Sequence, residues 1–562
     1  MRVRLLIIIL VSVFLCACTA DLVDAPPSAP SSPTPADHTL IQGASPALSW
    51  KAADAGGASY DVYLGTPGHV RLVASGLKQP HYKPSRELLR STMYQWQVGT
   101  FAGGGIGMSE LWSFTTGPGS SPDVPYNPSP PDASDQAIVN FAQLDWYGGD
   151  PDYDNVTYDL YFGRETNPPL LEGGLTNPGR NAPITDRGLY YWRVVAHDTY
   201  NLVTESPTWS FRVIPRVGYV YNWAGTGDAG TSAMGLDRRD TTLYWPVDVS
   251  FSPGGTPYVV DWNNHRIIAT DANDKFRLIA GGVFGDPCLS APAGCQNIVA
   301  AGCELNQPAH VTFDNNGNIV LSAWHNSELF RIDQNSGIMN RICGTGDRSF
   351  SPDGEPAATT VANLISSAAF DSQGRLYYTD QTNQVIRMID ANGIVHTVAG
   401  TNPVWDENVS RWNPQAGYAG DDGPATSALL NFDRGQLAMP SGRICFDASD
   451  NMYIADTGNH LIRGVSAGTI HAVAGFQAPR DVAVDDQGNV FVVDSVANTI
   501  SILSNGVVTK IAGGYGNGGS GLDDGVSALY ASFDSPMGIA LDAHGNVWIA
   551  DTGHSRIRIL YR

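Results

Sequence analysis

Short apolar stretches alternate with polar residues and turns along almost the whole chain. Over residues 39–215, runs such as Tyr60-Asp61-Val62-Tyr63-Leu64-Gly65 alternate with a period of two, and Gly- and Pro-rich segments separate them. From about residue 217, pairs of apolar runs are joined by turns such as Asp542-Ala543-His544-Gly545-Asn546. Both patterns predict β-strands, and no long helical pattern interrupts them. We therefore expect an all-β protein.

The pattern after residue 217 occurs six times. Each copy runs from a Pro or Ser into an apolar strand, an Asp-x-x-Gly-Asn-like turn and a second apolar strand that usually ends in Asp. The copies begin near Pro246, Pro308, Ser367, Pro440, Pro479 and Pro536, and their second strands end at Asp261, Ala323, Asp380, Asp456, Asp494 and Asp551. A unit of this size cannot bury its own apolar face, so the copies must stack on one another.

The copies predict a closed ring. Five of them end in an outer strand such as Ile279-Ala280-Gly281, but the sixth stops at Arg562 after its third strand. The missing ending stands instead before the first copy, in Val220-Tyr221-Asn222-Trp223-Ala224-Gly225-Thr226. An N-terminal strand that completes the last sheet leaves no open sheet edge. We therefore predict a six-bladed β-propeller over residues 216–562.

The residues of these copies resemble NHL repeats, including the form found in bacterial teneurin-like propellers. The glycine-rich segment Ala416-Gly417-Tyr418-Ala419-Gly420-Asp421-Asp422-Gly423 is similar to the joint of that form. Two earlier blocks, residues 39–118 and 119–215, repeat one another, since Leu48-Ser49-Trp50 returns as Leu144-Asp145-Trp146. These blocks resemble bacterial fibronectin type III-like domains. The resemblance implies two β-sandwiches that act as spacers, and their aromatic residues occupy core-facing positions rather than an exposed carbohydrate platform.

The N-terminus predicts export and lipid anchoring. Arg2 and Arg4 precede an apolar run over residues 5–15, which is too short to span a bilayer as a helix. The segment Leu15-Cys16-Ala17-Cys18 resembles a bacterial lipobox with Cys18 as the lipidated residue, and an ordinary secretory signal over residues 1–18 is the alternative. Thr19 after Cys18 favours the outer membrane of a Gram-negative bacterium. Residues 19–38 are rich in proline and predict an extended linker.

The net charge limits the classes of binding partner, and the cysteines predict a disulfide. The net charge is −22, which excludes nucleic acid and leaves the lipid anchor as the only expected membrane contact. In an exported protein, Cys288, Cys295 and Cys303 predict one disulfide of undetermined pairing, and a zinc site is the alternative. Cys343 and Cys445 occupy apolar strand positions and are expected to be small buried residues.

The loops of the predicted propeller fall on two faces. Asp-x-x-Gly-Asn turns, at residues 314–318, 485–489 and 542–546, close one face as tight hairpins, although calcium loops share their composition. Long joints gather on the opposite face, together with the turns after the second strands, at residues 227–243, 282–304, 345–363, 401–438 and 514–533. Insertions concentrated on one face indicate a binding surface.

Two sets of residues are candidates on that insertion face. The Asp that ends most second strands could form a cation-binding ring, but a residue repeated in every copy is better explained as a turn cap. Near the start of the first strand the repeat varies, and a polar ligand could bind there at the channel mouth. The residues at this variable position are Asp248, His310, Ser367, Arg443, Asp481 and Gly538, of which Asp248, His310, Arg443 and Asp481 are the candidate ligand-binding residues.

The function follows from these features. Related propellers include lyases with metal-bound histidines, but His265 and His460 are replaced by Ser327, Gln384, Asn498 and Ser555 at the equivalent positions, so no catalytic set emerges. We expect a monomeric, lipid-anchored protein that binds a protein or a glycan on the insertion face and needs no cofactor beyond a possible divalent cation. A metal-dependent lyase or hydrolase acting at the channel mouth is the alternative.

Overall fold

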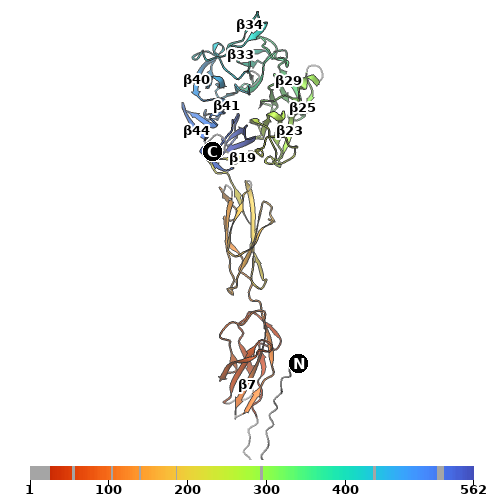
Figure 1. Cartoon of the computed structure of the whole chain (residues 1–562), viewed down its shortest axis with the longest axis vertical. Coiled ribbons are helices and arrows are strands. Elements are labelled where there is room, and N and C mark those ends of the chain that lie inside the picture. Colours follow the sequence, from red (N-terminus) through yellow and green to blue (C-terminus); the bar gives the residue numbers. More distant parts are fainter. Residues whose placement is uncertain are drawn as a thin grey trace, which may run out of the picture. The chain divides into compact units, whose positions relative to one another are not determined.

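The structure, a computed structural model, describes residues 26–52, 57–102, 105–137, 141–184, 187–290, 295–434, 438–514 and 524–562 (Figure 1). The predicted signal segment 1–18 with Cys18, and residues 19–25 of the linker, lie outside the described residues. The chain forms two compact units, one ending at Val213 and the other beginning at Ile214. No helix in the described ranges is both long and apolar enough to cross a membrane.

The first unit contains two arrangements of strands that repeat one another. In each, a three-stranded sheet accompanies a longer sheet. The first arrangement joins β1 (Ser31–Thr34), β3 (Leu48–Lys51) and β6 (His81–Tyr82), and in its other sheet β2 (Thr39–Ile41), β9 (Trp112–Thr116), β7 (Met93–Ala102), β4 (Ser59–Gly65) and β5 (Arg71–Leu77), with β8 (Gly105–Met108) beside β7. The core is aromatic, since Trp96 is fully buried and its ring centroid lies 4.9 Å from that of Trp112.

The second arrangement has the same strand order. It joins β10 (Tyr126–Ser129), β12 (Phe141–Tyr147) and β15 (Gly179–Pro183), and in its other sheet β11 (Ser134–Gln136), β18 (Trp209–Val213), β16 (Gly188–His197), β13 (Thr157–Gly163) and β14 (Leu170–Leu175), with β17 (Val203–Glu205) beside β16. Trp192 replaces Trp96 at the centre and lies 4.7 Å from Trp209, ring to ring. The repeated tryptophans are core residues in both copies, as the alternating pattern predicted.

The predicted end of the linker at residue 38 is wrong. Residues 31–38 belong to the predicted linker, but Ser31–Thr34 forms β1 and pairs antiparallel with β3. Asp37 also accepts hydrogen bonds from the backbone N–H and the hydroxyl of Ser113, at 2.6 and 3.0 Å. A proline-rich segment can join a sheet because an edge strand tolerates residues that lack an N–H. The proline content therefore concealed a strand.

Among its described residues, the second unit contains six sheets arranged as the blades of a propeller and one separate two-stranded hairpin (Figure 1). From the innermost strand outward, blade 1 is β20 (Pro246–Phe251), β21 (Pro257–Asp261), β22 (Arg266–Thr270) and β23 (Phe276–Phe284); blade 2 is β26 (His310–Phe313), β27 (Ile319–Ala323), β28 (Glu328–Ile332) and β29 (Ile338–Cys343); blade 3 is β30 (Ile365–Phe370), β31 (Leu376–Asp380), β32 (Val385–Ile389) and β33 (Val395–Ala399). Blade 4 is β37 (Ile444–Phe446), β38 (Met452–Asp456), β39 (Leu461–Ser466) and β40 (Thr469–Gly475); blade 5 is β41 (Pro479–Val484), β42 (Val490–Asp494), β43 (Thr499–Ser504) and β44 (Val507–Gly513); blade 6 is β46 (Gly538–Leu541), β47 (Val547–Asp551), β48 (Arg556–Leu560) and β19 (Tyr219–Ala224).

Blade 6 closes the ring as predicted. Strand β19, from the start of the unit, pairs antiparallel with β48, so that Val220 faces Leu560. The innermost strands contact their neighbours all the way around, including β46 against β20. Trp223 of β19 packs against Trp548 at 4.8 Å and against Phe276 of blade 1 at 5.7 Å, between ring centroids. The two ends of the propeller are therefore joined by backbone pairing and by an aromatic cluster.

Shorter elements decorate the joints between blades. In the described part of the chain these are α1 (Pro287–Ser290), β24 (Ile298–Val299), β25 (Ala301–Leu305), the hairpin β34 (Val404–Asp406) and β35 (Arg411–Asn413), β36 (Gly423–Pro424), β45 (Val526–Ser527), and the 3-10 turns η1 (Trp262–Asn264), η2 (Ala425–Ser427), η3 (Thr457–Asn459) and η4 (Ala528–Tyr530). Strands β25, β24, β36 and β45 extend the outer edges of blades 1, 2, 4 and 6. The joints therefore pack on the blade edges.

Candidate functional site

A cavity of about 410 Å³ opens among the joints and the turns that follow the second strands. Its lining combines residues that precede first strands with residues that follow second strands, and includes Trp245, Arg480, Ser495, Asp534, Ser535 and Met537. This mixture places the joints and these turns on one side of the ring, as the strand order predicted. We call this hollow the insertion-face cavity.

In five of the six blades an Asp ends the second strand, and this Asp holds a joint in place. Asp261 accepts a hydrogen bond from the backbone N–H of Tyr244 at 2.7 Å, and Asp551 accepts one from Asp534 at 2.9 Å. Similar bonds reach Asn363, Asn431 and Ala478 from the Asp of blades 3, 4 and 5. The recurring carboxylates therefore fix the residues that precede each first strand. This supports the turn-capping interpretation over a cation-binding ring.

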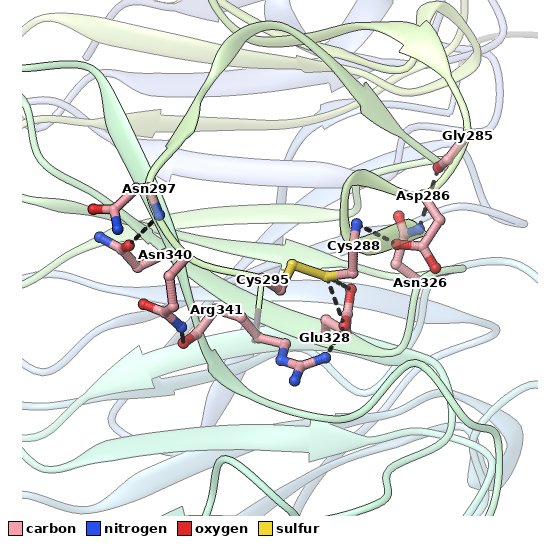
Figure 2. The surroundings of a disulfide bond; sticks show 10 residues. Gly285, Asp286, Cys288, Cys295, Asn297, Asn326, Glu328, Asn340 and Arg341 are labelled. Carbon is pink, nitrogen blue, oxygen red and sulfur yellow. Dashed lines mark hydrogen bonds and ion pairs between the residues drawn. A yellow bond between two sulfur atoms is a disulfide. The ribbon is translucent and has the colours of Figure 1, made fainter. Parts of the chain in front are cut away.

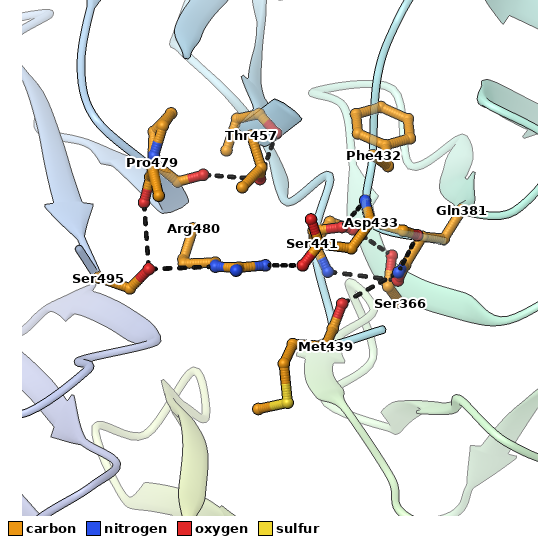
Figure 3. A network of polar contacts seen from close by, with 12 residues as sticks. Ser366, Gln381, Phe432, Asp433, Met439, Ser441, Thr457, Pro479, Arg480 and Ser495 are labelled. Atoms are coloured by element: carbon orange, nitrogen blue, oxygen red, sulfur yellow. Dashed lines mark hydrogen bonds and ion pairs between the residues drawn. The ribbon is translucent and has the colours of Figure 1, made fainter. Parts of the chain in front are cut away.

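Arg480 is held at the wall of the cavity by a polar network that crosses blades (Figure 3). Its guanidinium pairs with Asp433 at 2.5 Å and donates to the hydroxyl of Ser495 at 3.2 Å. Asp433 is itself fixed, because its backbone N–H donates to Ser441 at 2.9 Å and its carbonyl accepts from Gln381 at 2.8 Å. The cation is therefore held in a fixed position beside the cavity.

A row of aromatic rings runs beside the cavity. Trp245 lines it and remains 40% exposed, and its indole lies nearly parallel to that of Trp262, at 6.2 Å and 12°. Trp262 contacts Trp324 at 5.8 Å, which in turn stacks on His325 at 4.2 Å. Tyr244, also partly exposed, flanks Trp245 at 6.0 Å. Buried rings thus support one exposed tryptophan face.

The four predicted ligand-binding residues lie inside the ring instead of at its mouth. Asp248, Arg443 and Asp481 are 2%, 2% and 5% exposed, and His310 is half-buried. Asp248, His310 and Asp481 line a second cavity of about 410 Å³, whose other lining residues follow them along the first strands toward the hairpin turns. The variable position therefore belongs to the interior of the channel.

The variable position links neighbouring blades. Asp248 accepts a hydrogen bond from the backbone N–H of Val311 in the next blade, at 3.2 Å. The same type of bond recurs in three more blades: the backbone N–H of Ala368 donates to His310 Nδ1 at 3.2 Å, that of Ile444 to the hydroxyl of Ser367 at 3.3 Å, and that of Ile539 to the carboxylate of Asp481 at 3.0 Å. Asp, His and Ser all provide an acceptor, so the residue type varies while four of the six blades share the same hydrogen bond to the next blade. The sequence did not predict this hydrogen bond, because the donor strand belongs to another blade and lies next to the acceptor only in the folded ring.

Two blades depart from this pattern. Arg443 cannot accept a hydrogen bond, and it donates to the carbonyl of Ala309 at 2.6 Å while lying 3.8 Å from Asp248. Gly538 has no side chain, and a Cβ there would lie 2.6 Å from the carbonyl oxygen of Val247. The closest approach of blade 6 to blade 1 therefore requires glycine.

Burial and the neighbouring Arg443 shift the pKa values of the titratable residues at this position. Burial raises the pKa of Asp248 to about 7, against the opposing effect of Arg443. Burial, with Arg443 as a second cause, holds the pKa of His310 well below its usual value. A neutral imidazole is consistent with His310 Nδ1 accepting a hydrogen bond from the backbone. These residues are engaged with the protein itself.

The histidines give no support to a metal-dependent lyase. His265 and His460 both have positive φ, at 53° and 63°, and the equivalent residues Ser327, Gln384, Asn498 and Ser555 share this conformation. The shared geometry identifies a turn position. In the described ranges, the two groups of three acidic, Cys or His ligands close enough to hold a metal both lie away from the channel lining; they are Asp150, Asp154 and Asp198, and Cys288, Cys295 and Glu328.

The predicted disulfide forms between Cys288 and Cys295, while Cys303 is a free thiol (Figure 2). Cys343 is buried and Cys445 is half-buried. The carboxylate oxygens of Glu328 lie 3.1 and 3.3 Å from the sulfur of Cys288, and one of them pairs with Arg341 at 2.9 Å. Burial raises the pKa of Glu328 to about 7. In blade 2, where Ala323 replaces the usual Asp, Glu328 supplies a buried carboxylate.

Comparison with known proteins matches the propeller. The NHL repeat family matches residues 533–560, which include three strands of blade 6, β46, β47 and β48. Human Teneurin-1 is 23% identical over 357 residues, covering 58% of this chain and 12% of Teneurin-1. Suppressor of Quenching 1 of Arabidopsis thaliana is 21% identical over 424 residues, covering 75% of this chain and 33% of that protein. The chain thus spans a third or less of these relatives.

Solved structures resemble the chain weakly. A protein of unknown function from Bacteroides thetaiotaomicron is 16% identical, with a TM-score of 0.42, over 79% of this chain and 98% of that one. An auxiliary nutrient binding protein from Bacteroides ovatus is 15% identical, with a TM-score of 0.40, over 78% and 97%. A streptogramin B lyase has a TM-score of 0.34 at 11% identity, over 61% and 97%. Similarity at this level carries no argument about function.

Proposed function

We propose that this chain is an exported, lipid-anchored binding protein that takes a glycan in the insertion-face cavity. The observation that carries the proposal is the exposed indole of Trp245 at the wall of that cavity. Cavities of several hundred cubic ångströms suit small ligands or the end of a longer chain, whereas stable protein interfaces are broader and flatter. A protein partner on the same face is the other outcome of the test below.

The chemistry of the cavity suits a sugar ring. An indole supported by rings behind it offers a rigid apolar face at low entropic cost. Around it stand the guanidinium of Arg480, the carboxylate of Asp534 and the hydroxyls of Ser495 and Ser535, which can bond to hydroxyl groups at the edge of the ring. Small-ligand sites usually combine an apolar wall with a few polar groups, and this cavity has that composition.

The test is a screen of the exported chain against a panel of cell-wall and plant glycans, followed by calorimetry on any glycan that binds. Trp245→Ala should weaken binding at least tenfold, because it removes the stacking face. Trp405→Ala is the matched control, since Trp405 is 45% exposed on the hairpin strand β34 and does not line the cavity. Equal affinity of the Trp245→Ala variant and the wild type, or binding only of a protein partner, would contradict the glycan assignment.

The proposal also places the protein at the outer membrane, where a lipid on Cys18 would anchor it. Palmitate labelling of expressing cells should mark the wild type and leave a Cys18→Ser variant unlabelled. Surface proteolysis of intact cells then reports which side of the outer membrane the chain faces. An unlabelled wild type that is released into the medium would instead support the ordinary secretory signal.

A further inference from the structure

Three carboxylates converge in the second sandwich without a partner for all their oxygens. Asp150 and Asp154 lie in the segment between β12 and β13, and Asp198 directly follows β16. One oxygen from each lies within 4.8 Å of an oxygen from the other two. The glycan-binding proposal does not involve these residues. Asp150 and Asp198 each cap a turn through Oδ1, and this role leaves the second oxygen of each carboxylate unexplained.

Asp198 shows that the cluster is more than a group of surface acids. It is only 7% exposed, and its Oδ1 accepts hydrogen bonds from the backbone N–H groups of Tyr200 and Leu202, both at 2.8 Å. Its Oδ2 is shielded from solvent and has no hydrogen-bond partner. A buried carboxylate oxygen without a partner is costly, so a ligand that neutralises it would stabilise this arrangement.

The carboxylate of Asp150 is arranged like that of Asp198. Asp150 Oδ1 accepts a hydrogen bond from the backbone N–H of Asp152 at 2.7 Å, while its Oδ2 is buried and has no hydrogen bond. Asp154 differs, because its buried Oδ2 has no hydrogen bond but lies 3.3 Å from the guanidinium of Arg90. Backbone bonds thus orient Asp150 and Asp198 and leave one oxygen of each without a hydrogen bond, and an ion pair holds Asp154 beside them.

Arg90 does not satisfy the cluster. Its guanidinium bonds to Asp152 at 2.8 Å and lies 3.3 Å from both Glu87 and Asp154. One positive charge therefore faces several carboxylates. The cluster retains an excess of negative charge that a divalent cation would balance.

We propose that Asp150, Asp154 and Asp198 bind a calcium ion. Ca²⁺ takes oxygen ligands at about 2.3–2.6 Å, so two oxygens bound to one ion lie at most about 5 Å apart. The three oxygens lie within 4.8 Å of one another, which is compatible with this geometry. Calcium is chosen over Mg²⁺ because Mg²⁺ demands a near-ideal octahedron and keeps several of its waters, whereas Ca²⁺ accepts irregular sets of carboxylate oxygens. The ion would tie the β12–β13 segment to the end of β16.

The first sandwich provides an internal comparison. It has the same strand order, but its sequence between Lys51 and Ser59 holds a single acidic residue, Asp54. Ala102 stands where Asp198 follows the long strand, when Trp96 is aligned with Trp192. The inference therefore predicts one calcium ion per chain and not two.

The test is calorimetric titration of the exported chain with CaCl₂ alone, after treatment with EDTA and removal of the chelator. The wild type should bind one Ca²⁺, and Asp198→Asn should weaken this binding at least tenfold. Asparagine keeps the Oδ1 acceptor for the two N–H groups, so the fold should survive. Asp150→Asn provides a second variant with the same logic, and equal circular dichroism spectra in EDTA check folding.

The matched control is Asp135→Asn, which removes an exposed carboxylate from the same sandwich and should leave calcium binding unchanged. No calcium binding by the wild type at millimolar concentration would overturn the proposal. Unchanged affinity of both the Asp198→Asn and Asp150→Asn variants would also overturn it. Equally tight binding of Mg²⁺ would overturn the assignment to calcium. None of these outcomes depends on whether the insertion-face cavity binds a glycan.

Discussion

His310 in blade 2 and Ala368 in blade 3 are joined across the blade boundary by a hydrogen bond of 3.2 Å, in which the imidazole Nδ1 accepts the backbone N–H. The bond belongs to a series in which a polar side chain of one innermost strand satisfies the backbone of the next. Innermost strands of different blades do not pair as sheets, so their N–H groups need side-chain acceptors when buried.

The first prediction tests this link. His310→Leu should lower the free energy of unfolding by about 1–3 kcal/mol, because the buried N–H of Ala368 loses its acceptor. His310→Asn keeps an acceptor and should cost less. Urea denaturation of both variants measures the difference. Equal losses would show that the imidazole contributes by packing and not by this hydrogen bond.

The second prediction concerns pH. Burial raises the pKa of Glu328 to about 7 from its ordinary value of 4.5. The protonated form is therefore favoured by folding, and the stability this contributes is complete below pH 4.5 and is lost as pH rises through 7. Compared with a Glu328→Gln variant, the wild type should lose on the order of 3 kcal/mol between pH 4.5 and pH 8.

Urea denaturation at several pH values, with the disulfide kept oxidised, checks this prediction. The exposed residue Glu355 provides the control, since Glu355→Gln should leave the pH dependence of the wild type unchanged. A constant difference between the wild type and Glu328→Gln across the range would mean that Glu328 stays ionised beside Arg341.

The third prediction tests ring closure. Deletion of residues 217–226 removes β19, leaving the edge of β48 unpaired and the aromatic contact of Trp223 with Trp548 absent. We expect loss of cooperative thermal unfolding or aggregation, measured by calorimetry and light scattering. Replacing the hairpin over residues 404–413 with two glycines is the control and should leave the transition cooperative. A monomeric deletion variant with unchanged melting would contradict this closure.

The fourth prediction concerns the Asp that ends each second strand. Asp456 and Arg463 are both fully buried and lie 3.2 Å apart. Asp456→Ala should cost about 3–5 kcal/mol, because it leaves a buried guanidinium without this partner and frees the joint at Asn431. The double variant with Arg463→Met should recover part of this loss. A double-mutant cycle by urea denaturation measures the coupling, and additive losses would mean that the pair is not coupled.

Much of the fold could be predicted from local patterns. The strand pairs, the missing outer strand at Val220 and the tryptophans of both sandwiches are visible because periodicity and repetition are properties of the chain itself. The composition gave one wrong prediction: the prolines of residues 19–38 indicated an extended linker, but Ser31–Thr34 forms strand β1. An edge strand is decided by whether a neighbouring sheet offers a pairing edge, and no local pattern reports this.

The candidate sites depended on the tertiary structure to a much greater degree. The variation at Asp248, His310 and Asp481 predicts a ligand, and that stays a prediction; the structure adds that these residues line a cavity and accept hydrogen bonds from the next blade. The exposed face of Trp245 and the convergence of Asp198 with Asp150 and Asp154 had no sequence signal, because each brings together residues that are far apart along the chain.

By itself, the sequence determined that the chain is all-β, that six units close into a ring and that Asp residues cap their turns, since these features arise from short-range periodicity and repeated local bonds. Only the tertiary structure decided which polar residues are already satisfied by the protein and which retain a free oxygen or an exposed ring. That distinction depends on burial and on partners from distant segments, and it separates Asp248, which caps a neighbouring strand, from Asp198, which has an oxygen to offer a cation.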